Sequence, residues 1–248
     1  MARRTVCGLL VAVAMLTPAV GGITRAPVVA SQNAIFDFYL GGIWAGEMAV
    51  DAEFSAGAYR AGITARTAGI VGFFITAGVE AETVGRVEAN GLSPRRFVAD
   101  AYESRDRRRV EISYNGGSAA VRAEPAYEVR PWSISATGQG GMADPLSAVF
   151  EALTPGAVDT ICDQTADVFD GARRWAVEIG PPQPMSDDGR IRCEAVYVRI
   201  AGFKPKLMGE RARRPFALFF ERRADGLFQV VRAIGQTSYG LAVLLRRK

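Results

Sequence analysis

Asparagine-glycine and aspartate-glycine pairs recur along this chain and constrain its fold more than any other feature. The five pairs are Asn90-Gly91, Asn115-Gly116, Asp170-Gly171, Asp188-Gly189 and Asp225-Gly226. Such pairs favour the tight turns of β-hairpins because both residues tolerate the positive φ angles that these turns require. The chain is therefore expected to consist mainly of antiparallel strands.

The segments beside these turns alternate polar and apolar residues, as half-buried strands do. The expected hairpins pair residues 109–114 with 119–123, 166–168 with 175–179, and 216–221 with 227–234. Earlier strands are expected at 35–39, 43–54, 58–67, 79–89 and 96–102. A last strand over 239–245 is expected to close the sheet.

Two further patterns complete the fold class. Glycines within or beside the early strands fit bulges and bends, and these are Gly41, Gly42, Gly46, Gly62 and Gly85. One short helix is predicted near residues 144–153, because Asp144 can cap its N-terminus and Pro145 suits the first helical position. The prediction is a mainly β protein: an antiparallel curved sheet, open barrel or half-barrel, with one short helix.

The first 31 residues have the pattern of a cleaved signal peptide. Arg3 and Arg4 precede an apolar run from Val6 to Leu16, which is too short to span a membrane. Cleavage after Gly21 or near residues 29–31 fits the small residues there, and the later position is preferred. Cys7 lies too early for a lipoprotein signal. The mature chain is thus predicted to be a periplasmic protein that does not span the membrane.

Removing this segment leaves about 217 residues, 27 basic and 26 acidic, so the net charge falls from +4 to +1. A nearly neutral domain of this kind gives no support for nucleic-acid binding. Residues 32–248 are read as a single β-rich domain, with a possible hinge near 138–156 where glycine-rich chain enters the helix.

Two cysteines, Cys162 and Cys193, remain after the predicted cleavage. An even pair in an oxidising compartment favours a disulfide, and the alternative is two buried free thiols. The chain contains no histidine, so a zinc site would need carboxylates to complete its shell. No metal and no cofactor are expected.

The order of these features resembles the proteobacterial exported domain-of-unknown-function family 3108. The resemblance rests on Asp144-Pro145-Leu146-Ser147-Ala148 after a hairpin-rich front half, on Phe169-Asp170-Gly171, and on the closing run of strands. Further matching pieces are Tyr39-Leu40 with Gly46, Gly91-Leu92-Ser93-Pro94 with Phe97, and Ala195-Val196-Tyr197 before Gly202. The resemblance implies a periplasmic β-sheet domain of the open-barrel sort, akin to lipoprotein-carrier folds, and transfers no catalytic residue.

The residues present argue against most kinds of catalytic site. Without histidine there is no Ser-His-Asp or Cys-His system, and no serine lies three positions before any of the three lysines. The glycine-rich run 138–143 fits a dinucleotide motif but lacks the parallel-strand context. Carboxylates at Asp163, Asp167, Asp170 and Asp187-Asp188 could serve a glycosidase, although turns explain several of them. A non-enzyme is expected.

Two features remain as candidate binding sites. Arg107 and Arg109 belong to a basic cluster with Arg95, Arg96, Arg105 and Arg108, which could bind anionic headgroups but is more simply a solvated face. Phe73 and Phe74 lie in an apolar run, residues 70–75, between glycines. Such a run is ordinarily core, and the other reading is a lip on a hydrophobic cavity.

The expected function is a non-catalytic binding or scaffold module of the cell envelope. Its expected ligand is a lipid-like amphiphile or another envelope component. The alternative is a structural protein that contacts partners and holds no small ligand. The two hypotheses can be distinguished by structure, because only a ligand-binding module requires a sizeable apolar cavity.

Overall fold

The computed structural model describes residues 30–89, 91–185 and 189–248, and within these ranges thirteen strands form one antiparallel sheet. The predicted signal peptide and its cleavage sites lie outside the described residues, apart from Ala30 and Ser31. The strands are β1 (Ala30–Leu40), β2 (Ile43–Ser55), β3 (Ala58–Thr67), β4 (Ala77–Glu88), β5 (Gly91–Glu103), β6 (Asp106–Asn115), β7 (Ser118–Glu124), β8 (Gln164–Phe169), β9 (Arg174–Pro184), β10 (Ile191–Ala201), β11 (Arg213–Arg222), β12 (Phe228–Thr237) and β13 (Gly240–Arg246).

The strand order is β7-β6-β5-β4-β3-β2-β1-β13-β12-β11-β10-β9-β8. Two meanders of neighbouring hairpins, β1–β7 and β8–β13, are thus joined where the first strand pairs with the last. Phe36 lies opposite Arg246 in this pairing, and the Arg247 guanidinium donates to the Asp37 carboxylate across it. The mainly β, antiparallel prediction is confirmed.

The expectation that the last strand closes the sheet is wrong. β13 pairs with β1 on one side and β12 on the other, so it lies in the middle of the strand order. The sheet edges are β7 and β8, and they do not pair with each other. The chain between them bridges this gap at isolated points, Ser118 with Thr137 and Ala143 with Val168. The result is an open barrel.

The predicted hairpins form at the predicted turns. Asn115-Gly116 joins β6 to β7, Asp170-Gly171 joins β8 to β9, and Asp225-Gly226 joins β11 to β12. The pairing skips Ala45, next to Gly46 on β2, and Arg95 on β5, across from Gly85, so two of the predicted glycines lie at bulges. A bulge bends its strand and increases its twist, which helps the sheet to curl.

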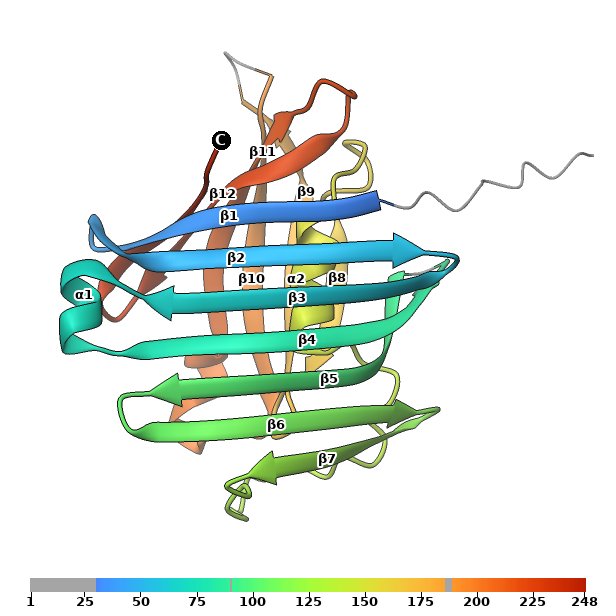
Figure 1. Ribbon diagram of the computed structural model, residues 1–248, viewed down its shortest axis with the longest axis vertical. Coiled ribbons are helices and arrows are strands. Elements are labelled where there is room, and N and C mark those ends of the chain that lie inside the picture. The colour runs from blue at the N-terminus through green and yellow to red at the C-terminus, as the bar shows by residue number, and fades with distance from the viewer. Residues whose placement is uncertain (1–29, 90, 186–188) are drawn as a thin grey trace, which may run out of the picture.

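Helix α2 (Pro145–Leu153) is the predicted helix, and it fills the hollow of the curled sheet. Figure 1 shows it between the strands β2–β4 in front and the strands of the second meander behind. Its Leu146 and Phe150 are almost fully buried among the inward residues of β1–β7. A second cluster around Phe220 and Val230 fills the other meander. The helix therefore supplies a core that the sheet alone would lack.

A second helix, α1 (Gly69–Phe74), was not predicted and corrects the one-helix expectation. It links β3 to β4, where the apolar run 70–75 was read as core or as a lip. Gly69 has a φ of +60° and lies against Trp44, and a Cβ at Gly69 would be 2.9 Å from a carbon of the indole ring. None of its six residues is buried, so this run is not core.

The predicted disulfide between Cys162 and Cys193 is present. Cys193 lies on β10, whereas Cys162 lies just before β8, and their Cα atoms are 6.1 Å apart. Both residues are buried among Ile161, Ile179 and Phe220. The bridge therefore ties the loop that follows α2 to the centre of the second meander.

Candidate functional site

A groove of about 960 Å³ opens at the end of the curled sheet that carries α1. Its wall comes from the inward faces of β1–β5 and β13. Phe38, Met48, Val79 and Leu244 provide the apolar surface, and the small residues Ala65 and Ala101 leave space between them. Alternation along each strand points these residues to the same side as buried core neighbours such as Phe36 and Ala61. The groove is thus a continuation of the core that no side chain fills.

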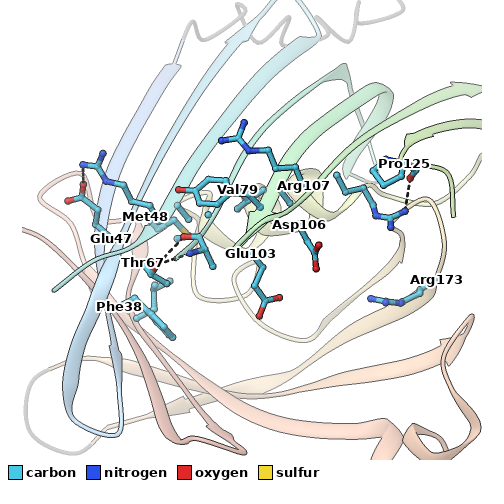
Figure 2. Close-up of a pocket in the computed structure, with 18 residues that line it drawn as sticks. Phe38, Glu47, Met48, Thr67, Val79, Glu103, Asp106, Arg107, Pro125 and Arg173 are labelled. Carbon is cyan, nitrogen blue, oxygen red and sulfur yellow. Dashed lines mark hydrogen bonds and ion pairs between the residues drawn. The ribbon is translucent and has the colours of Figure 1, made fainter. Parts of the chain in front are cut away.

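Charged side chains gather at the mouth of this groove. Figure 2 shows Glu103 and Asp106, from the β5–β6 turn, and Arg173, from the β8–β9 turn, around the hollow. Arg108 also lines it and donates a 2.7 Å hydrogen bond to the carbonyl of Pro125. Within the described part of the chain, no carboxylate lies within ion-pair distance of Arg108 or Arg173. The mouth therefore carries two guanidinium groups that form no ion pair within the described residues, together with the carboxylates of Glu103 and Asp106.

Aromatic rings hold both guanidinium groups in place. The Arg108 guanidinium lies 4.7 Å from the centre of the Tyr127 ring, and that of Arg173 lies 5.5 Å from the centre of the Phe203 ring. Stacking on an aromatic ring leaves the edge of a guanidinium group free to donate hydrogen bonds. An anionic headgroup could use those donors.

The predicted residues Phe73 and Phe74 lie beside the groove and not within it. They are 84% and 76% exposed, and their ring centres are 5.2 Å apart. The helix that carries them joins Thr67 to Ala77, and both of these residues line the groove. The two rings thus stand outside its rim.

The predicted arginines Arg107 and Arg109 point away from the groove interior. On β6 they alternate with Arg108, Val110 and Ile112, whose side chains face inward. Arg107 stacks over Tyr102 on the convex face, with its guanidinium 5.5 Å from the ring centre, and borders the groove. Arg109 forms an ion pair with Asp100.

Reasoning from the sequence named Arg108 only as a member of the basic cluster, and it did not consider Arg173 as a binding residue. A signal for Arg108 was available, because it lies two residues before Val110 and shares that residue's side of the strand. Arg173 had no comparable signal. It reaches the groove only because the β8–β9 turn meets the β5–β6 turn across the hollow.

A second cluster of polar side chains lies at the N-terminus of α2, where Asp144 is fully buried. One carboxylate oxygen accepts hydrogen bonds from the backbone N–H groups of Leu146 and Ser147, at 2.8 and 2.9 Å. The other accepts from the hydroxyls of Thr83, at 2.8 Å, and Ser147. The Tyr59 hydroxyl lies 2.6 Å from that of Ser147. This cluster anchors the helix to β3 and β4 and explains the Asp144-Pro145-Leu146-Ser147 motif as a structural one.

Burial raises the pKa values of the titratable groups in and around this anchor. Removal from water raises the pKa of Asp144, opposed by its hydrogen bonds from Ser147, Thr83 and Leu146. Burial likewise raises the pKa of Tyr59 to about 12 and that of Glu151 on α2. Each shift has desolvation as its largest cause. Such shifts favour the protonated forms.

We expect Asp144 to make the folded state less stable as the pH rises. A carboxyl whose pKa is raised on folding binds its proton more tightly in the native state, so its stabilising contribution is greatest below the ordinary carboxyl pKa and is lost as pH rises through the raised value. For one proton the slope is at most about 1.4 kcal/mol per pH unit. Asp144→Asn keeps a capping oxygen but cannot ionise.

Urea unfolding of the wild type and Asp144→Asn, measured from pH 4 to pH 8, tests this expectation. The unfolding free energy of the wild type should fall relative to that of Asp144→Asn as the pH increases. Glu151 and Asp170, whose pKa values are also raised, are present in both proteins and cancel in the difference. Parallel pH profiles would show that Asp144 does not titrate in this range.

Two of the carboxylates considered for a glycosidase have other partners in the described structure. Asp170 accepts hydrogen bonds from the N–H groups of Ala172 and Arg173 in its turn, and Asp167 pairs with Arg174. Asp163 lies just before β8, and Asp187-Asp188 fall outside the described residues. Residues 30–89, 91–185 and 189–248 also contain no cluster of three or more histidine, cysteine or acidic residues placed to hold a metal, and no helix long and apolar enough to cross a membrane.

Comparison with known proteins adds a family and a fold. Residues 35–199 match the family described as "Protein of unknown function (DUF3108)". Among solved structures, the chain is similar to a "Beta-barrel-like Protein of Domain of Unknown Function DUF1849 from Brucella abortus". That likeness covers 90% of this chain and 98% of the other, with 15% sequence identity and a TM-score of 0.51, so it concerns the fold alone. No curated protein matches the chain.

Proposed function

The chain belongs to the DUF3108 family, whose function is unknown, and from this premise and the groove we propose that it is a non-catalytic binding module of the periplasm that holds a lipid-like amphiphile. The observation that carries the proposal is the groove itself, with an apolar wall and a charged mouth. An acyl chain would lie along Phe38, Met48, Val79 and Leu244. An anionic headgroup would lie near Arg108 and Arg173.

The size of the groove suits such a ligand. Its volume of about 960 Å³ lies at the upper end of the range of small-molecule sites. Burial of about ten methylenes gains roughly 8 kcal/mol at about 0.8 kcal/mol each. A micromolar dissociation constant corresponds to a binding free energy of about the same size. The groove must therefore be preformed, so that little of this free energy is lost in ordering the protein.

The location in the envelope draws support from the disulfide. Structural disulfides persist in oxidising compartments and are rare in the cytosol. Together with the signal-peptide pattern of residues 1–31, the Cys162–Cys193 bridge favours the periplasm. An open barrel with an apolar interior is a suitable carrier or sensor for a molecule that is poorly soluble in that compartment.

A structural role without a small ligand is the second candidate, and one observation favours it. The apolar side chains of α1 are exposed, as at a site of contact with a larger partner. The two candidates differ in what they require of the groove. Only the binding module needs its interior to remain open.

We expect Ala65→Trp to weaken ligand binding at least tenfold. Ala65 lines the groove, and an indole there would occupy the space that an acyl chain needs. Ala49→Trp is the matched control, because Ala49 is exposed on the neighbouring strand β2 and lies opposite Thr64. Protein purified from periplasm would first be examined by native mass spectrometry, then delipidated and titrated with a fluorescent fatty acid.

Saturable binding by the wild type and Ala49→Trp, with weak binding by Ala65→Trp, would support the proposal. Thermal melts of the three proteins would show whether each is folded. If the wild type carries no co-purifying mass and shows no saturable binding, the proposed function is wrong. Equal binding by Ala65→Trp would mean that the ligand lies elsewhere.

A further inference from the structure

We propose that the end of the sheet carrying α1 docks onto the surface of an anionic lipid bilayer. This surface, called here the α1 rim, consists of the β1–β2 turn, α1 and the β12–β13 turn. The inference concerns the outer surface beside the groove and stands independently of what the groove holds.

Large apolar side chains are concentrated and exposed on the α1 rim. Tyr239 and Ile70 are 74% and 68% exposed, alongside the two phenylalanines. Ile43, Trp44, Ile75 and Leu241 are also exposed on the same rim. Globular proteins commonly expose single apolar residues, but a contiguous group of this size indicates an interaction surface.

Backbone contacts join the three connections into one surface. The N–H of Gly41, in the β1–β2 turn, donates a 2.9 Å hydrogen bond to the carbonyl of Leu241 on β13. Helix α1 packs on β2 beside Trp44, as the close approach of Gly69 to the indole shows. Figure 1 shows α1 and the β12–β13 turn projecting from the same end of the molecule.

The α1 rim contains no charged residue. Residues 38–46, 68–79 and 235–245 lack aspartate, glutamate, lysine and arginine altogether. The turns at the opposite end of the same strands include Glu88, Arg222, Arg223 and Asp225. Removing the α1 rim from water would therefore bury no charged side chain. Removing the opposite end from water would bury several, which is energetically costly.

An excess of positive charge lies at the same end of the sheet, in the connection between β10 and β11. Antiparallel alternation places the β5–β6 and β10–β11 connections at the same end of the sheet as α1. The β10–β11 connection and the adjoining start of β11 carry Lys204, Lys206, Arg211 and Arg214, none of which has a carboxylate within ion-pair distance among the described residues, although Glu210 lies in the same connection. The β5–β6 connection is mixed, since Arg105 lies between Glu103 and Asp106. Cations beside a membrane attract anionic headgroups, each contributing about fivefold in affinity.

The combination favours a bilayer over a protein as the partner. Interfacial anchors place aromatic and apolar side chains in the acyl boundary and surround them with cations. Protein interfaces generally include hydrogen-bonding side chains within the buried area. The exposed side chains of α1 offer none, because all six residues are glycine, isoleucine, valine or phenylalanine.

The test uses vesicles of phosphatidylethanolamine and phosphatidylglycerol, and vesicles of phosphatidylcholine alone. Flotation of the mature wild type should show binding to the anionic vesicles. Phe73→Ser combined with Phe74→Ser should weaken that binding about a hundredfold, since two large aromatic side chains lose their burial. The matched control combines Val87→Ser with Leu227→Ser, which are half-exposed at the opposite end of the sheet.

A charge variant tests the second part of the proposal. Lys204→Gln combined with Lys206→Gln should weaken binding to the anionic vesicles at least fivefold and leave binding to phosphatidylcholine unchanged. Adding salt to 0.5 M should reduce the difference between the two vesicle types, because screening weakens surface electrostatics.

Three outcomes would overturn the proposal. The first is no binding of the wild type to either vesicle, and the second is unchanged binding by the double phenylalanine variant. The third is a wild type that stays off vesicles but self-associates, with the phenylalanine variant monomeric in analytical ultracentrifugation, because the α1 rim would then be an interface between copies. Ala65→Trp should still bind vesicles, so failure of fatty-acid binding and failure of membrane docking can be told apart.

Discussion

Asp144→Ala should lower the free energy of unfolding by about 3 to 5 kcal/mol. Loss of a helix N-cap costs about 1 kcal/mol, and each buried hydroxyl that loses its acceptor costs about 1 to 3 kcal/mol. Thr83 and Ser147 both donate to Asp144, and all three side chains are fully buried. The loss should be large because the anchor connects α2 to the sheet around which the core forms.

Urea unfolding followed by circular dichroism measures this effect. Asp159→Ala, at an exposed aspartate after α2, is the matched control and should change stability by less than about 0.5 kcal/mol. Asp144→Asn should lose much less than Asp144→Ala, because asparagine is also a good N-cap. Equal losses for the alanine and control variants would mean that the buried carboxylate is not needed to hold the helix.

Removing the disulfide should also destabilise the protein strongly, by about 3 to 4 kcal/mol. The bridge closes a loop with a sequence separation of 31, and loops of this length lose roughly that much conformational freedom in the unfolded chain. Cys162→Ala combined with Cys193→Ala should therefore unfold at lower urea concentration than the oxidised wild type. The reduced wild type should resemble the double variant.

Thiol titration gives an independent check. The mature wild type, denatured without reductant, should contain no free thiol, because Cys7 lies in the predicted signal peptide. Two titratable thiols would contradict the bridge. A double variant as stable as the oxidised protein would show instead that packing among Ile161, Ile179 and Phe220 suffices to hold this region.

Local sequence patterns were enough to predict every strand except β10 (Ile191–Ala201), and most of the turns. Asn115-Gly116 and Asp170-Gly171 each impose a turn that depends on two residues alone, so no tertiary contact is needed to recognise it. Helix α2 was predicted for the same reason, since Asp144 and Pro145 mark its start. Features of this kind depend only on neighbours in the chain.

Predictions failed where tertiary contacts decide the outcome. Residues 70–75 are apolar but short, and a short apolar run is compatible with either a helix or a strand. Its helical form depends on packing against Trp44, which the run itself does not reveal. The last strand has the pattern of any strand, and nothing in it indicates that its partner is β1.

The groove could be predicted only in part. The signal-peptide pattern, the expected curvature and an apolar run suggested a binding site. Of the two arginines chosen, Arg107 borders the groove and Arg109 pairs with Asp100 on the convex face. Counting alternation from Val110 would have selected Arg108 instead. The contribution of Arg173 depends on the way the sheet curls, which single-strand patterns do not encode.

The pairing of β1 with β13 has a consequence for the order in which the molecule folds. Within each meander every strand pairs with its neighbour in the chain, so these contacts are local and can form quickly. The seam between the meanders is different, since Asp37 and Arg247, which pair across it, are 210 residues apart. A chain that is still being synthesised can complete neither the seam nor the barrel until its final residues have been released. Until then the two meanders remain separate, and the edges of β1 and β12 are open to other chains. The risk of aggregation is therefore greatest before β13 is available to pair with both strands.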